Sequence, residues 1–324
     1  MNFPVFDLHC DTALRLLGDD VNQAGSLNAN GGHIDLTRAK QFPGYCQCFA
    51  CFTTPYMEKK DWYGLSPVVV FEREIATIQR EIDRNKDRIA LCYTPEEVAA
   101  NQKRGLMSAI LTIEGPAGFG FDPELLESLF LAGFRISTLG WNEQNPLIGS
   151  HLTGGGLTDL GKAYVKNAQA LGMLVDVSHC SDEGFWDIVK ITGAPIIASH
   201  SNSRAVWNHS RNVTDDMFRA IRETGGVIGI NEYAAFLGEN ATLDTVCDHI
   251  FHFMELDPEG KHIALGGDLD GCSQLPQSFT GVDSYQPLAE RLLERGLTEQ
   301  NVMDIYWNNA LGVMSTALRD NKID

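Results

Sequence analysis

The stretch Phe3-Pro4-Val5-Phe6-Asp7-Leu8-His9-Cys10-Asp11 joins an apolar run to a histidine and an aspartate two residues apart. Side chains at positions i and i+2 of an extended strand point to the same side, so His9 and Asp11 can bind one cation together. Cys10 points to the opposite side, where we expect it only to pack. The stretch His33-Ile34-Asp35 has the same spacing but follows a segment rich in Gly and Asn rather than an apolar run. Only further ligands in matching positions can distinguish the first pair from the second.

Apolar segments with strand character alternate with amphipathic segments with helix character along the rest of the chain. The predicted strands span residues 3–8, 45–53, 108–113, 134–139, 174–178, 195–199, 226–230 and 262–266. The predicted helices span residues 67–87, a segment opened by the capping signature 94–97, and residues 123–132, 160–171, 182–192, 215–223, 243–255, 285–295 and 299–318. Residues 89–92 are a ninth strand candidate, which we take as accessory because it is the shortest and a barrel closes with eight.

This alternation predicts a parallel sheet with helical crossovers. The 324 residues exceed the usual size of one domain, but (β/α)8 barrels are a standard exception. No internal repeat or linker marks a second unit. We therefore expect an α/β fold in which residues 1–324 form a single (β/α)8 TIM-barrel domain with C-terminal helices.

The composition of the chain indicates which partners and which cellular location to expect. The formal net charge of −18 argues against nucleic acids and anionic membranes as partners, because both would be repelled. No segment has the apolar length that spans a bilayer, and the first residues lack the features of a secretion signal. The eight cysteines lie mostly in apolar runs, so we expect reduced, buried thiols and a cytoplasmic location.

The cluster Cys46-Gln47-Cys48-Phe49-Ala50-Cys51 could be a thiolate metal site. A strand there would place Cys46 and Cys48 on one face and Cys51 on the other. A four-thiolate site would also need a second cysteine cluster nearby, which the sequence lacks. We expect these cysteines to pack as small apolar side chains.

Five of the predicted strands end on residues that can bind a metal ion. Barrel active sites form at the C-terminal ends of the strands, so these side chains are expected to meet on one rim. Imidazole and carboxylate ligands without thiolate suit Zn, Mn, Fe or Co. Three histidines and three carboxylates exceed the needs of one tetrahedral ion, which favours two metals bridged by a carboxylate. The residues are His9, Asp11, Glu114, His179, His200 and Asp268.

Nearly end to end, the chain resembles the membrane (renal) dipeptidase family of binuclear zinc peptidases, within the amidohydrolase-like barrels. The stretches that carry this resemblance are Asp7-Leu8-His9-Cys10-Asp11-Thr12, Thr112-Ile113-Glu114-Gly115, Asp176-Val177-Ser178-His179, Ser199-His200-Ser201, Ser210-Arg211-Asn212-Val213 and Gly266-Gly267-Asp268-Leu269-Asp270-Gly271.

The resemblance implies a role for each of these residues. Asp268 would contact the metal-bound water, act as the general base and return the proton to the leaving amine. Arg211 would bind the terminal carboxylate of the substrate, a task suited to a planar bidentate donor. The two cations would lower the pKa of a bridging water, giving hydroxide near neutral pH. The implied zinc ligands are His9 and Asp11 for one ion, His179 and His200 for the other, and Glu114 as the bridge.

The chain departs from the family pattern at one position. Where the best-known members carry a histidine thought to bind the oxyanion, this chain has Trp141, followed by Asn142. The Trp141 N–H could donate one hydrogen bond to a tetrahedral intermediate, or its ring could be an aromatic wall of the pocket. We expect Trp141 and Asn142 to contact substrate. His151, on a Gly-rich loop, is a candidate substitute for the missing histidine.

The function expected from the sequence is that of a cytoplasmic metallo-dipeptidase with two Zn²⁺ ions per chain, or other divalent transition metals. Its substrates would be free dipeptides of L,L and L,D configuration. The family resemblance also implies that the protein forms a homodimer. A related barrel amidohydrolase acting on another small amide or an N-acyl amino acid is the alternative. A metal-binding protein without catalysis is a third, but a purely structural site has no use for the spare base Asp268.

Overall fold

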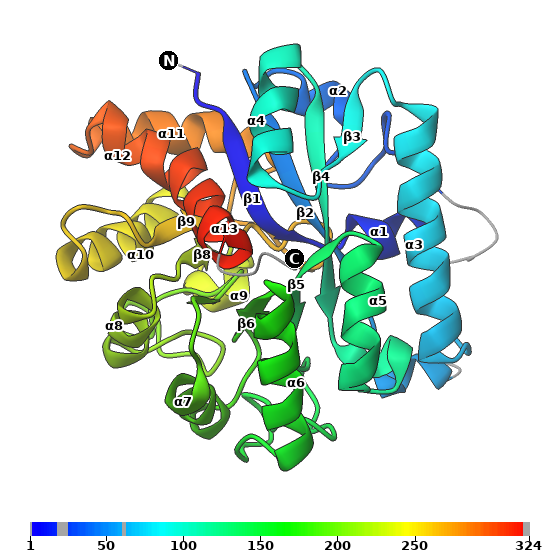
Figure 1. Ribbon diagram of the computed structural model, residues 1–324. Coiled ribbons are helices and arrows are strands. Elements are labelled where there is room, and N and C mark those ends of the chain that lie inside the picture. Colours follow the sequence, from blue (N-terminus) through cyan, green and yellow to red (C-terminus); the bar gives the residue numbers. More distant parts are fainter. Residues whose placement is uncertain (1, 18–24, 60–62, 320–324) are drawn as a thin grey trace.

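The computed structural model describes residues 2–17, 25–59 and 63–319. Its parallel strands form a ring in the order β7-β6-β5-β4-β2-β1-β9-β8 (Figure 1). A parallel bridge between Ala198 and Ile228 joins the two ends of this order. The predicted (β/α)8 barrel is therefore confirmed. Its strands are β1 (Val5–Cys10), β2 (Tyr45–Phe52), β4 (Met107–Glu114), β5 (Phe134–Thr138), β6 (Leu174–Asp176), β7 (Ile196–Ile197), β8 (Ile228–Ile230) and β9 (Ile263–Leu265).

The short strand β3 (Ile89–Leu91) lies outside the ring. It pairs in parallel with the start of β4, where Ile89 lies opposite Met107. The prediction of an accessory strand at 89–92 is confirmed. The following helix begins as the capping signature predicts, because Thr94 accepts from the Glu97 N–H and the Glu97 carboxylate accepts from the Thr94 N–H.

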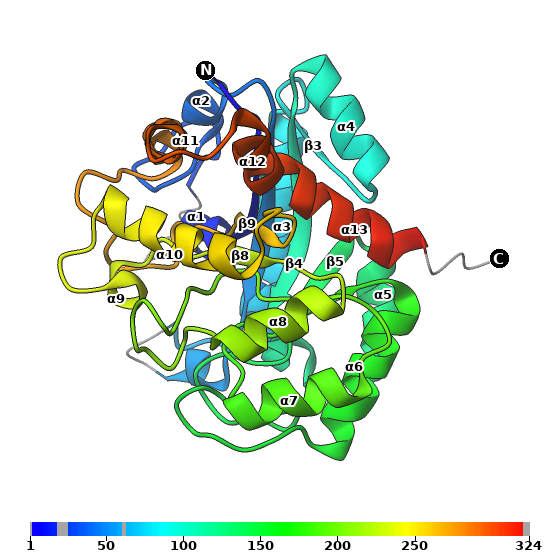
Figure 2. The same ribbon diagram turned by 90° about the vertical axis from the view of Figure 1, so that its left-hand side faces the viewer.

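Helices surround the barrel, and α7, α8 and α10 follow one another on one flank (Figure 2). None of the helices in the described part of the chain is long and apolar enough to cross a membrane. The α-helices are α1 (Thr12–Leu17), α2 (Leu36–Ala39), α3 (Pro67–Arg84), α4 (Pro95–Arg104), α5 (Leu126–Leu131), α6 (Asp159–Leu171), α7 (Asp182–Ile191), α8 (Asp215–Glu223), α9 (Ala234–Leu237), α10 (Leu243–Leu256), α11 (Tyr285–Glu294), α12 (Glu299–Met303) and α13 (Asn309–Arg319).

The structure differs from the predicted elements in several places. The short helices α1, α2 and α9 were not expected, because four to six residues are too few to show a helical period. Residues 19–24 of the segment rich in Gly and Asn that precedes His33 lie outside the described residues. The predicted C-terminal helix 299–318 is interrupted by a π-helical turn, Asp304–Asn308. In this turn the buried Asp304 carboxylate accepts hydrogen bonds from Lys261, Gln300 and Asn308.

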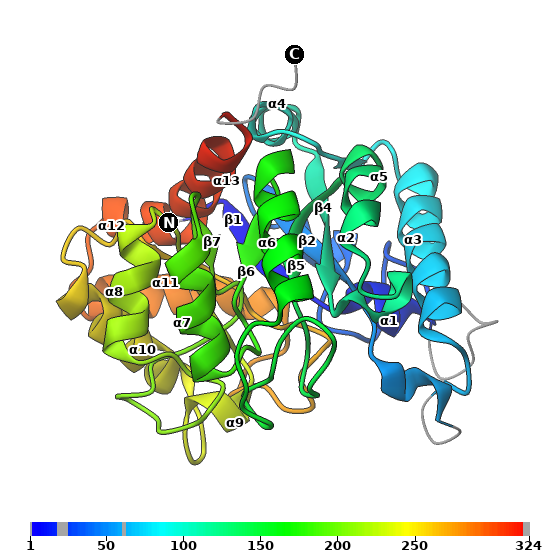
Figure 3. The same ribbon diagram turned by 60° about the horizontal axis from the view of Figure 1, so that its bottom comes forward.

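The interior of the barrel is apolar at the N-terminal ends of its strands. Phe6 of β1 packs edge-on against Trp307, with ring centroids 5.8 Å apart. The C-terminal segment thus covers this end of the barrel, while α9 lies toward the opposite end (Figure 3). Cys46 and Cys48 point into this interior cluster and Cys51 packs between sheet and helices, as predicted. All eight cysteines are free thiols. The C-terminal end of the barrel is therefore left for the site.

Candidate active site

The predicted ligand residues meet at the C-terminal rim of the barrel, and each is buried. Glu114, the last residue of β4, lies at their centre. Its Oε1 is 3.0 Å from His179 Nε2 and 3.8 Å from His200 Nε2. Its Oε2 is 3.3 Å from His9 Nε2, which is 3.4 Å from Asp11 Oδ2. The two oxygens of one carboxylate therefore face two different pairs of donors.

The histidines are packed directly against one another. The ring of His9 stacks on that of His200 with centroids 3.8 Å apart, and His179 Nε2 lies 3.0 Å from His200 Nε2. His9 Nε2 is buried and has no hydrogen-bond partner among the described residues. Three groups of donor atoms lie close enough to hold a cation: His9, Asp11 and Glu114; Glu114, His179 and His200; and His9, His200 and Asp268.

The outer nitrogens of two of these histidines are fixed by neighbouring side chains. His179 Nδ1 is 2.9 Å from Asn142 Oδ1, which can only accept, so His179 carries its proton on Nδ1. His200 Nδ1 is 2.6 Å from the Ser199 hydroxyl, which itself donates to Asp176. Both Nε2 atoms therefore direct a lone pair into the cluster, because a hydrogen bond at the outer ring nitrogen fixes the orientation of a histidine ligand.

The electrostatics of the cluster also fit a bound cation. Burial, helped by the Asp11 carboxylate, raises the pKa of Glu114. Burial raises the pKa of Asp268 to about 6, although His9 opposes this shift. Burial lowers the pKa of His179 and His200 well below the usual value of histidine. Burial opposes protonation of His9 as well, but the Glu114 and Asp11 carboxylates beside it raise its pKa. A divalent cation would favour the ionised carboxylates and would take the place of a proton at these nitrogens. Residues and geometry thus fit divalent metal ions held by nitrogen and oxygen.

A cavity of about 190 Å³ opens above this cluster. Asp268 points into it from the loop after β9, and its Oδ2 accepts a hydrogen bond of 3.0 Å from Asn231. Asp268 has a φ of +56°, a left-handed conformation uncommon outside glycine and typical of strained functional positions. Gly271 is required beside it, because a Cβ there would lie 2.0 Å from Asp11 Oδ2. The cavity is lined by Asp11, Leu14, Phe52, Glu114, Trp141, Asn142, His179, Tyr233, Phe236, Asp268, Asp270 and Gly271.

Arg211 lies beside the cluster on the loop after β7, and only 4% of it is exposed. Its guanidinium donates to Ser201 Oγ and to the His200 carbonyl, each at 3.2 Å. Its Nε has no hydrogen-bond partner in the part of the chain that the structure describes. The guanidinium also lies 5.5 Å from the centre of the Phe236 ring, which lines the cavity. The buried Arg211 guanidinium therefore lies next to the site and has one N–H, at Nε, that is not used in a hydrogen bond to the described residues.

The remaining candidates occupy distinct places. Trp141 packs edge-on against Phe52, with centroids 5.0 Å apart, and forms a wall of the cavity. Both ring nitrogens of His151 are engaged, with Asn142 and with Ser210. The pair 33–35 lies outside the cluster: His33 Nδ1 accepts from the Asp270 N–H, and Asp35 caps α2.

The structure adds residues that sequence reasoning missed. Asn231 follows β8 at the same rim, so the strand-end argument could have found it. Asp176 was visible in a quoted stretch, but its link to His200 through Ser199 depends on the pairing of β6 with β7. The cavity walls Tyr233 and Phe236 come from a loop and a short helix that carry no periodic signal.

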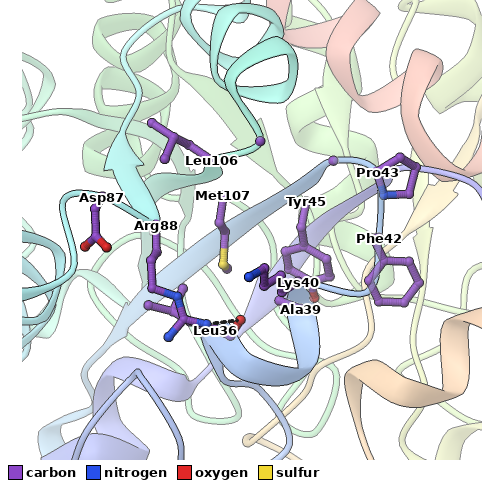
Figure 4. Close-up of a pocket in the computed structure, with 12 residues that line it drawn as sticks. Leu36, Ala39, Lys40, Phe42, Pro43, Tyr45, Asp87, Arg88, Leu106 and Met107 are labelled. Carbon is purple, nitrogen blue, oxygen red and sulfur yellow. Dashed lines mark hydrogen bonds between the residues drawn. The ribbon is translucent and has the colours of Figure 1, made fainter.

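A larger cavity of about 340 Å³ lies at the opposite end of the barrel (Figure 4). It is bordered by the starts of β2 and β4, where Tyr45 and Met107 face it together with Leu36 of α2. The charged residues that line it are Lys40, Asp87 and Arg88. None of the clustered histidines and carboxylates lines it, so we place the candidate active site in the cavity of about 190 Å³ at the C-terminal rim.

Comparisons with known proteins agree with this geometry. The sequence model described as "Membrane dipeptidase (Peptidase family M19)" matches residues 1–322. An uncharacterized dipeptidase of Schizosaccharomyces pombe is 31% identical over 333 residues, covering 97% of this chain and 81% of that protein. A metallo peptidase from Rhodobacter sphaeroides, liganded with a phosphinate mimic of the dipeptide L-Ala-D-Ala, has a TM-score of 0.87 at 25% identity, covering 98% of this chain and 100% of that chain. A structure of dipeptidase AC, a metallo peptidase of family M19, has a TM-score of 0.87 at 26% identity, covering 98% and 99%.

Proposed function

Because the chain belongs to the membrane dipeptidase family, peptidase family M19, and is a dipeptide-hydrolysing metalloenzyme, we propose that it works with two zinc ions and cleaves both L,L and L,D dipeptides. The arrangement of Glu114 carries the proposal of two ions. One of its oxygens faces His179 and the other faces His9, so a single carboxylate serves two donor sets. The mimic of L-Ala-D-Ala held by the similar metallo peptidase supports the L,D substrates.

Bound metal ions would supply Lewis acidity to polarise the scissile carbonyl and to make a water molecule nucleophilic at neutral pH. His9 and Asp11 would hold one ion and His179 and His200 the other, with Glu114 shared by both sets of ligands. The hydrogen bonds from His179 to Asn142 and from His200 to Ser199 keep both Nε2 lone pairs directed inward.

Asp268 accepts the proton of the attacking water and returns it to the leaving amine. Its position at the cavity and its pKa near 6 suit a base that works near neutral pH. Asn231 holds one carboxylate oxygen of Asp268, which leaves the other oxygen for the proton.

Arg211 binds the terminal carboxylate of the dipeptide. Two observations support this role: its Nε lacks a hydrogen-bond partner among the described residues, and its guanidinium lies next to the Phe236 ring that borders the cavity. The Phe52 and Trp141 rings exclude water from the reacting bond and contact an apolar side chain of the substrate.

A substrate panel tests this proposal. The protein is stripped of metal with a chelator, reloaded with Zn²⁺, and assayed with L,L dipeptides, L,D dipeptides and N-acyl amino acids. We expect turnover of both dipeptide classes that depends on added metal. Turnover of N-acyl amino acids alone would contradict the proposal and favour the amidohydrolase alternative.

A further inference from the structure

Four side chains form a continuous hydrogen-bonded row that leads away from the cluster. His179 Nδ1 lies 2.9 Å from Asn142 Oδ1, and His151 Nε2 lies 2.9 Å from the same oxygen. His151 Nδ1 in turn lies 2.8 Å from Ser210 Oγ. The row begins at a proposed metal ligand and ends at the residue before Arg211.

With a neutral His151 ring, one arrangement of protons satisfies this row. Asn142 Oδ1 is an acceptor with two lone pairs, so it accepts from His179 Nδ1 and from His151 Nε2. His151 therefore carries its proton on Nε2, and its Nδ1 accepts from the Ser210 hydroxyl. Burial and the nearby Arg211 lower the pKa of His151 to about 3, which keeps the ring neutral as this arrangement requires.

The row connects three separate loops at the rim. Asn142 and His151 follow β5, His179 follows β6, and Ser210 follows β7. The backbone strengthens the first connection, because the His151 N–H donates to the His179 carbonyl at 2.9 Å. Between the His151 loop and the Arg211 loop, the His151–Ser210 hydrogen bond is joined by a looser contact of the His151 and His209 rings, 6.2 Å apart.

We propose that His151 is a positioning residue that fixes the Arg211 loop relative to His179 and thereby makes the site selective for substrates whose carboxylate lies one residue beyond the scissile bond. This inference rests on the proposed function, because it assigns the substrate carboxylate to Arg211. His151 acts through Asn142 on the metal side and through Ser210 on the substrate side. Neither of its ring nitrogens is left to contact the substrate.

The test compares His151→Phe, which keeps a ring but removes both hydrogen bonds, with the wild-type protein. The matched control is Leu152→Ala on the same loop, where the side chain is 66% exposed. Two readouts are taken: Zn²⁺ affinity by competition with a chelator, and the ratio of kcat/KM for a dipeptide to that for its C-terminal amide. We expect His151→Phe to weaken Zn²⁺ binding about 3- to 10-fold and to lower the ratio by a similar factor, the cost of one oriented hydrogen bond.

Two further variants separate positioning from general loss of structure. His151→Gln retains an N–H that can reach Asn142, so it should recover most of the Zn²⁺ affinity. Ser210→Ala breaks only the far end of the row, so it should raise KM for the dipeptide while leaving Zn²⁺ affinity unchanged.

The outcomes are distinct. Wild-type Zn²⁺ affinity and an unchanged dipeptide-to-amide ratio in folded His151→Phe would overturn the inference, as would equal losses in Leu152→Ala. If the zinc-loaded wild-type protein hydrolyses no dipeptide, the proposed function fails. The Zn²⁺ affinities of the His151 variants would still decide whether the row positions His179.

Discussion

Asn231 Nδ2 lies 3.0 Å from Asp268 Oδ2, so the residue that follows β8 holds the proposed base that follows β9. The two oxygens of the Asp268 carboxylate would then have different roles: one accepts the hydrogen bond from Asn231, and the other is the proposed proton acceptor. Oδ2 is held by Asn231, and Asp268 is one of the residues that line the cavity. The relationship gives the first two predictions.

Replacing Asp268 by Asn should leave Zn²⁺ bound and lower kcat by about 10²- to 10⁴-fold, because the variant cannot accept a proton. Metal content by elemental analysis and kcat with a dipeptide check this. Activity within a few fold of wild type at full metal content would contradict the assignment of Asp268 as base.

Replacing Asn231 by Asp should move the acidic limb of kcat/KM to higher pH. The Asn231 hydrogen bond lowers the pKa of Asp268, and the variant replaces that donor by a like charge while keeping an acceptor for the Tyr233 N–H. Because the base works deprotonated, a raised pKa requires a higher pH for activity. A pH–rate profile at saturating Zn²⁺ measures the limb, and a limb that stays in place would count against this role.

Replacing Arg211 by Lys should raise KM for a dipeptide by about 10- to 100-fold, because an ammonium cannot bind a carboxylate in bidentate fashion. The C-terminal amide of the same dipeptide serves as the control substrate. The KM for this amide should change little. An equal rise in KM for both substrates would show that Arg211 does not bind the substrate carboxylate.

Replacing Trp141 by Phe distinguishes the two roles left open for this residue. The ring lines the cavity and packs on Phe52, so we expect an aromatic wall. Trp141→Phe should then keep kcat within about threefold, whereas loss of an oxyanion donor costs about 10²- to 10³-fold. A fall of that size in steady-state kcat would assign the indole N–H to the oxyanion instead.

Replacing Glu232 by Gln should stabilise the protein increasingly as pH rises. Glu232 is buried, neither carboxylate oxygen has a hydrogen-bond partner among the described residues, and burial raises its pKa well above the usual value. Its contribution to stability is complete below its ordinary pKa and is lost as pH rises toward the raised one. The variant's gain in unfolding free energy should grow by up to about 1.4 kcal/mol per pH unit.

Urea unfolding between about pH 5 and about pH 8 measures this effect. The exposed Glu239, replaced by Gln, is the matched control and should show no such trend. A gain that does not depend on pH would mean that Glu232 is ionised in the folded protein.

The position of the cluster of histidines and carboxylates could be predicted from the sequence, because the end of each strand can be recognised without knowing which distant residues it contacts. The C-terminal ends of parallel strands meet on one rim, so Glu114 and His179 could be placed together before any distance was known. The pair 33–35 could be set aside for the same reason, since no strand precedes it. Whether these residues bind metal stays a prediction.

What the sequence could not predict depends on contacts between distant loops. The link from Asp176 through Ser199 to His200 requires the pairing of β6 with β7, and the row through His151 requires three loops to meet. The π-helical turn at 304–308 was not predicted either, because the contacts that the buried Asp304 makes there with Lys261, Gln300 and Asn308 leave no signal in the sequence. The hydrogen-bond partner of a given side chain depends on tertiary packing, whereas the end of a strand can be recognised in the local sequence.

Whether Glu114 serves two metal ions at once can be decided by the metal stoichiometry of the protein. Metal-free protein is titrated with Zn²⁺, freed of excess ion, and analysed for zinc per chain, beside Glu114→Gln treated in the same way. We expect two zinc ions in the wild-type protein and at most one in the variant. A single ion in the wild-type protein, or two ions held equally by both, would contradict it.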